Sequence, residues 1–229
     1  MESDDIKTAV DNAVRHWLQA HDRRSIPLTV THLHSHFDHI AGDSQLAQLL
    51  DTTVIPHSSV SALQTEFGIT SWPTDLGRYD LGGRVLDVVP IPGHDETSIA
   101  VYDRQTGLLL TGDTMYPGRI YINMPDHTVF TASADRLVDF ARTRVITHVL
   151  GSHIEQRGPY RDYPVETTFA PDEQRLELSY GHLLELQQGA DDLDSAGKVV
   201  QRAFHDFSIA GPYPQSDPLL PDGSPRPPQ

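Results

Sequence analysis

The chain has 229 residues, of which 38% are hydrophobic and 21% are charged, and these values suit one globular domain with a sizeable core. Its formal charge of −15 argues against a broad basic face for nucleic acid or an anionic membrane. The absence of cysteine excludes disulfide bonds and thiolate ligands. The acidic first residues lack the apolar stretch of a signal peptide, and no run reaches the length of a membrane span. We therefore expect a cytoplasmic protein.

Helices and strands alternate in the first part of the chain. Apolar residues recur at helical spacing over residues 4–20, which predicts an amphipathic helix. Two short apolar runs predict strands, and serine or glycine–aspartate signals predict helix starts. The remaining expected elements are strands at 26–30 and 53–55, helices starting near 43 and 58, and a loop-rich stretch at 68–83.

The second part predicts a β-hairpin followed by helices. Ser133 is expected to cap one helix, and Gly189 is expected to end a later one. The tail has seven prolines, so we expect it to be extended or disordered and assign the folded domain to residues 1–210 and the tail to residues 211–229. The other expected elements are strands at 84–91, 97–102, 108–111 and 145–150, and helices at 172–188 and 197–204.

Histidines and an aspartate are concentrated just after the first predicted strand. Residues 31–39 contain four histidines and one aspartate, out of 13 histidines in the chain. Imidazole nitrogen and carboxylate oxygen are the ligands that hold zinc and related divalent ions. His34 and His36 are close enough to share one metal ion, and Asp38 and His39 follow in the same turn. This loop therefore predicts a metal site.

Three further candidate ligands, His94, Asp113 and His153, each follow the end of a predicted strand. Strands that deliver polar residues from their ends to one edge of a sheet build a site there, and the neighbouring glycines permit tight turns. His148 is the rival of His153, but it lies within the predicted strand. Together with the first cluster, these residues supply the ligands that a site for two metal ions needs.

Four other polar residues near these positions receive lesser roles. His32 precedes the cluster and is expected to support it or to lie in the core, and His57 is expected to be a turn residue near the pocket. Thr114 and Glu155 are candidates to orient the ligands through hydrogen bonds.

The motifs His34-Ser-His36-Phe-Asp38-His39, Pro-Gly-His94, Gly-Asp113-Thr and Gly-Ser-His153 resemble those of the metallo-β-lactamase superfamily. The resemblance implies an α/β fold, an αββα sandwich with the site at one edge. It also implies that the first metal is bound by His34, His36 and His94, that the second is bound by Asp38, His39 and His153, and that Asp113 bridges the two.

The front of the chain departs from this family pattern. Only 33 residues precede His34, and they predict mostly one helix where the family usually has several strands. We therefore expect a member whose first N-terminal strands are missing. A homodimer is expected as one way to cover the exposed sheet.

The resemblance implies a hydrolase of a small ester, thioester, lactone or amide. Two zinc ions are expected, with iron or manganese as alternatives, and a bridging hydroxide would attack the substrate. Asp38 or Asp113 would pass on a proton. Tyr116, Arg119 and Tyr121 are candidate substrate-binding residues, with Arg119 pairing a substrate carboxylate, although an ordinary packed loop is an equal alternative.

Two other functions remain open at this point. One is a mononuclear iron dioxygenase of thiol-derived substrates, which would use only the first set of ligands. The other is a degenerate, non-catalytic protein that keeps metal for stability. The presence of all seven candidate ligands favours the hydrolase with two metal ions over both.

Overall fold

The computed structural model describes residues 6–122, 127–165, 167–199 and 201–211, so the predicted tail lies outside the described residues from position 212 onward. The helices are α1 (Ile6–Ala20), α2 (Phe37–Ile40), α3 (Asp43–Leu46), α4 (Val60–Phe67), α5 (His127–Arg142) and α6 (Tyr180–Ala196). The strands are β1 (Leu28–Val30), β2 (Thr52–Val54), β3 (Gly77–Asp80), β4 (Val85–Pro90), β5 (Ile99–Asp103), β6 (Leu108–Gly112), β7 (Arg119–Tyr121), β8 (His148–Gly151), β9 (Gln156–Gly158), β10 (Arg161–Asp162), β11 (Glu177–Leu178), β12 (Arg202–Ala203) and β13 (Ser208–Ala210).

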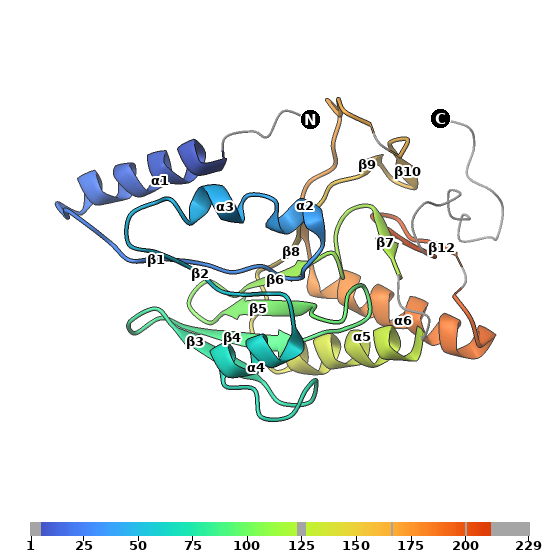
Figure 1. The fold of residues 1–229 in the computed structure, drawn as a ribbon. Helices are drawn as coiled ribbons and strands as arrows, with labels where there is room; N and C mark the ends of the chain where they lie inside the picture. Colours follow the sequence, from blue (N-terminus) through green and yellow to red (C-terminus); the bar gives the residue numbers. More distant parts are fainter. Residues whose placement is uncertain (1–5, 123–126, 166, 200, 212–229) are drawn as a thin grey trace.

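A six-stranded sheet with the order β11-β8-β6-β5-β4-β3 forms the centre of the molecule (Figure 1). Strands β6 and β8 pair in parallel, while the other neighbouring strands of this sheet are antiparallel. The predicted β-hairpin is confirmed as β5 and β6, which pair from Val101–Leu110 to Asp103–Leu108. The expectation of a mixed α/β layered fold is likewise confirmed.

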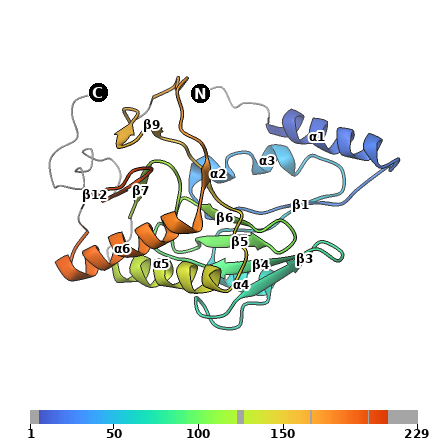
Figure 2. The same cartoon turned by 180° about the vertical axis from the view of Figure 1, so that it is seen from behind.

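Helices α5 and α6 lie side by side and cover one face of this sheet (Figures 1 and 2). The apolar side chains between them and the sheet form the larger core, in which Leu109, Phe130, Leu137 and Leu183 are completely buried. Burying each such side chain stabilises the fold by about 2 kcal/mol. This rigid layer fixes the strands whose ends carry the candidate ligands.

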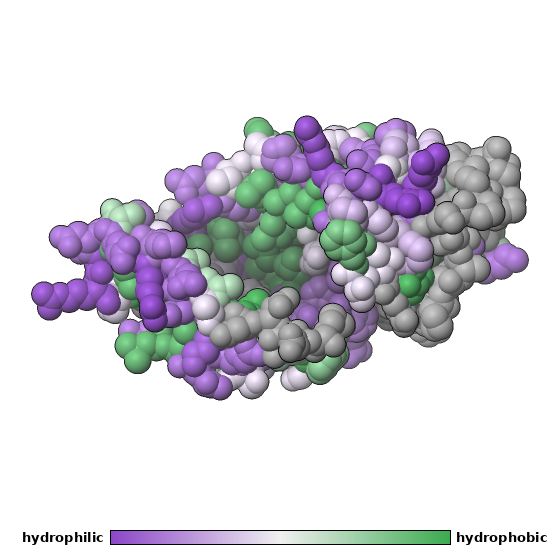
Figure 3. Space-filling view, turned by 90° about the horizontal axis from the view of Figure 1, so that it is seen from above, coloured by the Kyte–Doolittle hydropathy of each residue, from purple (hydrophilic) through white to green (hydrophobic). Residues whose placement is uncertain are grey.

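The opposite face of the sheet is covered less completely. Helix α4 and residues beside β2 pack on it through a second core that includes Ile55, Leu63 and Phe67. Strands β1 and β2 form a small parallel sheet above it, with α1, α2 and α3 on top (Figure 1). Seen from above, the molecule has a central hollow lined by hydrophobic side chains (Figure 3). Helix α1 buries none of its residues.

Two smaller sheets lie beside the main one. Strands β12, β13 and β7 form a three-stranded sheet, and β9 and β10 form an antiparallel pair. Among the described residues, no helix has both the length and the apolar composition needed to cross a membrane.

Two predicted helix boundaries are wrong, because the residue expected to begin or end the helix lies inside it and makes a tertiary contact instead. Ser133 lies inside α5, and its hydroxyl donates to the carbonyl of Pro92 at 2.6 Å instead of capping the helix. Gly189 does not end α6; it is buried where a Cβ atom would come within 2.5 Å of Ile209. The helix continues to Ala196 and ends at Gly197, which has a left-handed conformation.

Three further elements differ from the sequence prediction. The late helix begins at Tyr180 rather than near residue 172. The short helix expected at 197–204 is wrong, because Arg202–Ala203 pair with β13. The stretch expected to be loop-rich contains β3, which completes the edge of the sheet through its pairing with β4. Both β12 and β3 form by pairing with the next strand along the chain.

Candidate metal centre

The seven predicted ligands come from five segments that meet at one end of the six-stranded sheet. His34 and His36 lie after β1, and Asp38 and His39 lie on the short helix α2. The other three lie beyond strand ends of the main sheet: His94 after β4, Asp113 after β6 and His153 after β8. The expectation that strand ends bring these residues together is therefore matched by the structure.

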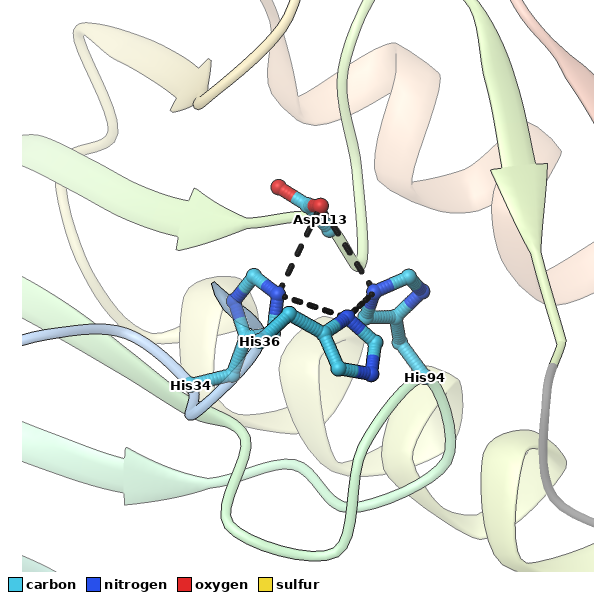
Figure 4. A group of neighbouring side chains, drawn as sticks. All are labelled: His34, His36, His94 and Asp113. Carbon is cyan, nitrogen blue, oxygen red and sulfur yellow. Dashed lines mark hydrogen bonds and ion pairs between the residues drawn. The ribbon is translucent and has the colours of Figure 1, made fainter. Parts of the chain in front are cut away.

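The first group consists of His34, His36, His94 and Asp113 (Figure 4). His36 Nδ1 lies 3.1 Å from His34 Nε2 and 3.0 Å from His94 Nε2. Asp113 Oδ2 lies 3.6 Å from His34 Nε2 and 3.5 Å from His94 Nε2. Three of the four residues are buried, and His36 faces solvent with about a third of its side chain. One donor atom from each therefore points to a common point.

The second group consists of Asp38, His39 and His153. Asp38 Oδ2 lies 3.4 Å from His39 Nε2 and 3.5 Å from His153 Nε2. The Asp38 side chain is 60% exposed, whereas that of Asp113 is 7% exposed. The second group is thus the solvent-facing half of the site.

Asp113 joins the two groups. Its Oδ2 atom lies 3.3 Å from His39 Nε2 and 3.2 Å from His153 Nε2, in addition to its contacts with the first group. Burial opposes ionisation of this carboxyl, but hydrogen bonds from His153 and His39 keep its pKa well below the usual range. The same contact with Asp113 raises the pKa of His153. One carboxylate oxygen therefore faces four imidazole rings.

The chemistry of these donors fits divalent metal ions. Burial lowers the pKa of His34 to about 3 and also lowers the pKa of His94, so both rings are neutral and present lone pairs at physiological pH. Within the described chain, the buried Asp113 Oδ1 atom has no hydrogen-bond partner. Neutral imidazoles and carboxylates that converge on one point are the arrangement that zinc and similar ions require.

Two groups that the sequence analysis did not assign hold the histidines in place. The His94 Nδ1 atom donates to the carbonyl of Tyr121 at 2.8 Å, which leaves Nε2 for the site. His36 Nε2 lies 3.7 Å from Asp95 Oδ2. Asp95 follows His94 directly, and this position is a sequence signal that could have identified it. Such contacts fix ring orientation and raise ligand basicity.

Two glycines allow the strand ends to approach closely enough. A Cβ atom on Gly151 would lie 2.3 Å from the Cβ atom of Tyr116. Gly112 has a φ of 56°, and a Cβ atom there would lie 2.9 Å from Leu33. Any side chain at either position would push apart the segments that carry the donors.

The other polar candidates lie outside the ligand groups. His32 donates to Asp43 at 2.7 Å, and the buried His57 donates to the carbonyl of Thr97 at 3.3 Å. His148 is exposed at the start of β8. Thr114 makes no hydrogen bond through its buried hydroxyl within the described chain, so its predicted orienting role lacks a contact.

The three predicted substrate-binding residues point into the protein. Tyr116 and Arg119 are each 1% exposed, and Tyr121 is 7% exposed. Arg119 Nη2 donates to the carbonyl of Tyr163 at 2.6 Å, and its Nε lies 3.4 Å from Asp162 Oδ2.

Glu155 accepts a hydrogen bond from the Arg119 backbone at 2.7 Å. The placement of Arg119 does not match the expectation that this residue pairs with a substrate carboxylate. Acidic side chains inside the protein already compensate the charge of its guanidinium group. Glu155 therefore holds the start of β7, and its expected hydrogen bond to a ligand is not among the described contacts.

Comparison with known proteins gives matches over much of the chain. The chain is 32% identical over 94 residues to acyl-coenzyme A thioesterase MBLAC2 of Gallus gallus, a match that covers 39% of this chain and 33% of that protein. It is 33% identical over 106 residues to hydroxyacylglutathione hydrolase of Ectopseudomonas mendocina (strain ymp), covering 44% of this chain and 38% of that protein. The matches thus span well under two thirds of these relatives.

A solved metallo-beta-lactamase from Pontibacter korlensis is similar over 78% of this chain and 76% of its own, with 19% identity and a TM-score of 0.44. The family model of the metallo-beta-lactamase superfamily matches residues 34–148, about half of the chain, including all the predicted ligands except His153. The chain belongs to the metallo-beta-lactamase superfamily.

Proposed function

We propose that this protein is a metal-dependent hydrolase that cleaves a small acyl compound, with a thioester as the favoured substrate. The observation that carries the proposal is the position of Asp113 Oδ2, which lies 3.2–3.6 Å from the Nε2 atoms of four histidines. The names of the two similar relatives describe a thioesterase of acyl-coenzyme A and a hydrolase of hydroxyacylglutathione. Both names favour acyl transfer to water.

The proposed ligands are His34, His36 and His94 for one ion and Asp38, His39 and His153 for the other, with Asp113 between them. Divalent ions bound here would lower the pKa of a water molecule and polarise the acyl carbonyl. The Tyr121 carbonyl and Asp95 keep the rings of His94 and His36 in their binding orientation. These two histidines therefore need little rearrangement to bind metal.

Asp38 is the better placed of the two predicted proton carriers. Its side chain is 60% exposed, so its carboxylate can exchange a proton with solvent or with a leaving group, whereas the Asp113 carboxylate is enclosed by histidines. The negative charge of Asp113 is instead expected to compensate the positive charge of the bound metal ions.

Phe37, which separates the two ligand groups in the sequence, supports an apolar substrate. Phe37 lies between His36 and Asp38, and it is 81% exposed. An aromatic ring that faces solvent beside the site offers contact area to the acyl chain. Phe37→Ala is expected to raise KM for long acyl chains more than for acetyl substrates, while kcat changes little.

The proposal is tested by elemental analysis of the native protein together with a substrate panel. The panel comprises acyl-coenzyme A thioesters, S-acylglutathiones, an aryl ester, a lactone and a β-lactam. Two zinc ions per chain with thioester turnover support the proposal, whereas one iron ion per chain without hydrolysis supports the dioxygenase alternative. Full metal occupancy without any turnover supports a non-catalytic protein.

A matched pair of histidine variants tests the proposed ligands. His36→Ala is expected to remove metal and activity together, whereas His16→Ala changes an exposed residue of α1 and should leave both intact. Stoichiometric metal in the His36→Ala variant contradicts the ligand assignment.

A further inference from the structure

A surface pocket of about 500 Å³ lies between α4, the loop that follows it and α5. None of the seven candidate ligands lines it, so it is separate from the metal centre. The residues that shape it are Val60, Trp72, Pro73, Pro92, Val129 and Arg136.

Most of the pocket wall is apolar and rigid. Trp72 and Pro73 lie on the loop after α4, and Pro92 is held by the hydrogen bond from Ser133 to its carbonyl. An indole ring and two prolines form flat surfaces that lose little conformational freedom when they contact a ligand. Such a wall suits a flat apolar or aromatic body.

Arg136 places a positive charge in this wall. Its side chain is half-buried, and its hydrogen bond runs from Nη1 to the carbonyl of Pro90 at 3.4 Å. Among the described residues, no carboxylate forms an ion pair with it. Its neighbours on α5 are already engaged, since Asp135 accepts from Gln187 at 2.7 Å and Asp139 pairs with Arg142 at 3.2 Å.

An uncompensated guanidinium costs free energy when it is removed from water. Burial accordingly lowers the pKa of Arg136, whereas aspartates raise the pKa of Arg84 and the pKa of Arg104. A carboxylate on a ligand would supply the missing charge in a planar, two-oxygen geometry that matches guanidinium.

We propose that this pocket binds a small organic carboxylate with a flat apolar body, the carboxylate on Arg136 and the body against Trp72 and Pro73. Glu96 also lines the pocket, but its side chain is exposed, and it forms no ion pair with Arg136 in the described structure. Its charge weakens binding without blocking it. The pocket touches Pro92 and Glu96, each two residues from His94, so a ligand there contacts the loop that carries this histidine.

Naphthalene-2-carboxylate and the uncharged naphthalene-2-carboxamide are the matched probes. The chain has two tryptophans, Trp17 and Trp72, so the indole N–H resonances in a ¹H–¹⁵N spectrum report two separate places. Trp17→Phe assigns them. The carboxylate is expected to shift the Trp72 resonance in a saturable manner, to leave the Trp17 resonance in place, and to bind about fivefold or more tightly than the carboxamide.

Variants of three charged residues test whether Arg136 causes the preference for the carboxylate over the carboxamide. Arg136→Met should abolish the preference for the carboxylate, while Arg142→Met, a change at an exposed arginine of the same helix, should preserve it. Glu96→Gln should strengthen carboxylate binding by about twofold and leave carboxamide binding unchanged.

Equal binding of the two probes to the native protein, or a preference that persists in Arg136→Met, would overturn the proposal. A shift confined to Trp17 would overturn it as well. If Arg136→Met does not fold, as judged by its spectrum, Glu96→Gln decides: no gain in carboxylate affinity refutes the proposed site. None of these results depends on hydrolase activity, so the outcome is independent of the proposed function.

Discussion

At one end of the six-stranded sheet, Asp87 and Asp103 each lie against an arginine, whereas at the other end Asp113 lies among histidines. Arg104 donates to both oxygens of Asp87, at 2.6 and 2.8 Å, and Arg84 donates to Asp103. All three aspartates are buried. The first two carboxylates are therefore compensated by charges of the chain itself, while Asp113 faces rings that are neutral when they are ready to bind metal.

This contrast explains what each end of the sheet does. Permanent ion pairs at the arginine end satisfy their own carboxylates and contribute to folding alone. The histidine end contains neutral donors around the Asp113 carboxylate, so full compensation of this negative charge requires a cation from outside the chain. The following predictions test this difference, beginning with the largest expected effect.

Asp113→Ala is expected to release at least one ion, and both if the groups depend on one another, and to lower hydrolysis by more than about 100-fold. The reason is that its Oδ2 atom faces both groups of donors. Elemental analysis and initial rates measure the two effects.

Asp87→Asn is the matched control at the other end of the sheet. It removes an equally buried carboxylate charge, so it should lower the melting temperature while metal content stays at the native value. Native metal content in Asp113→Ala, or metal loss in Asp87→Asn, would erase the distinction between the two ends.

Asp38→Asn separates the two donor groups. Because Asp38 is exposed and contacts only His39 and His153 among the donors, we expect loss of the second ion and retention of the first. Activity should fall by about 10- to 100-fold. Loss of both ions, or of neither, would contradict the division into two groups.

Removal of metal by a chelator should destabilise the protein by about 3 kcal/mol when free metal had been about 100-fold above its dissociation constant. For a chain of this size the melting temperature should fall by about 6–12 °C. Asp113→Ala serves as the control, because chelator should cause little further change in it.

Asp103→Asn should produce the smallest effect, and one that depends on pH. Arg84 and, less strongly, the Thr106 hydroxyl hold the pKa of Asp103 below its usual range, against the opposing effect of burial. The stabilisation by Asp103 is thus present above a pH of about 4 and is lost as the pH falls further. The melting temperatures of the variant and the native protein should converge in acid, and the metal content should be unchanged near neutral pH. A difference in melting temperature that grows in acid would refute the predicted direction of the pH dependence.

The donors could be identified from sequence because each depends on local signals. His94, Asp113 and His153 follow apolar runs and lie one or two residues after a glycine. Strands β4, β6 and β8 run in the same direction, so they end at the same edge of the sheet. The hairpin of β5 and β6 was predictable for the same reason, since its two apolar runs are separated by a short turn.

Features that rest on distant contacts could not be identified in this way. In the sequence Gly189 resembles the end of a helix, but in the structure it lies inside the helix, close to Ile209. In the sequence Arg119 is a candidate to bind substrate, but in the structure it contacts Asp162 and the carbonyl of Tyr163. The partner of His94 Nδ1 is a backbone carbonyl at Tyr121, which no side-chain pattern marks. The expected homodimer remains a prediction.

Helix α1 buries no residue, although it is 15 residues long, whereas α5 buries eight of its 16. Amide hydrogens of α1 should therefore exchange with deuterium through local fraying, while those of α5 should exchange only when the whole domain opens. Among the described residues, limited proteolysis should consequently cut the segment between α1 and β1 first and leave a resistant fragment that still contains every proposed ligand.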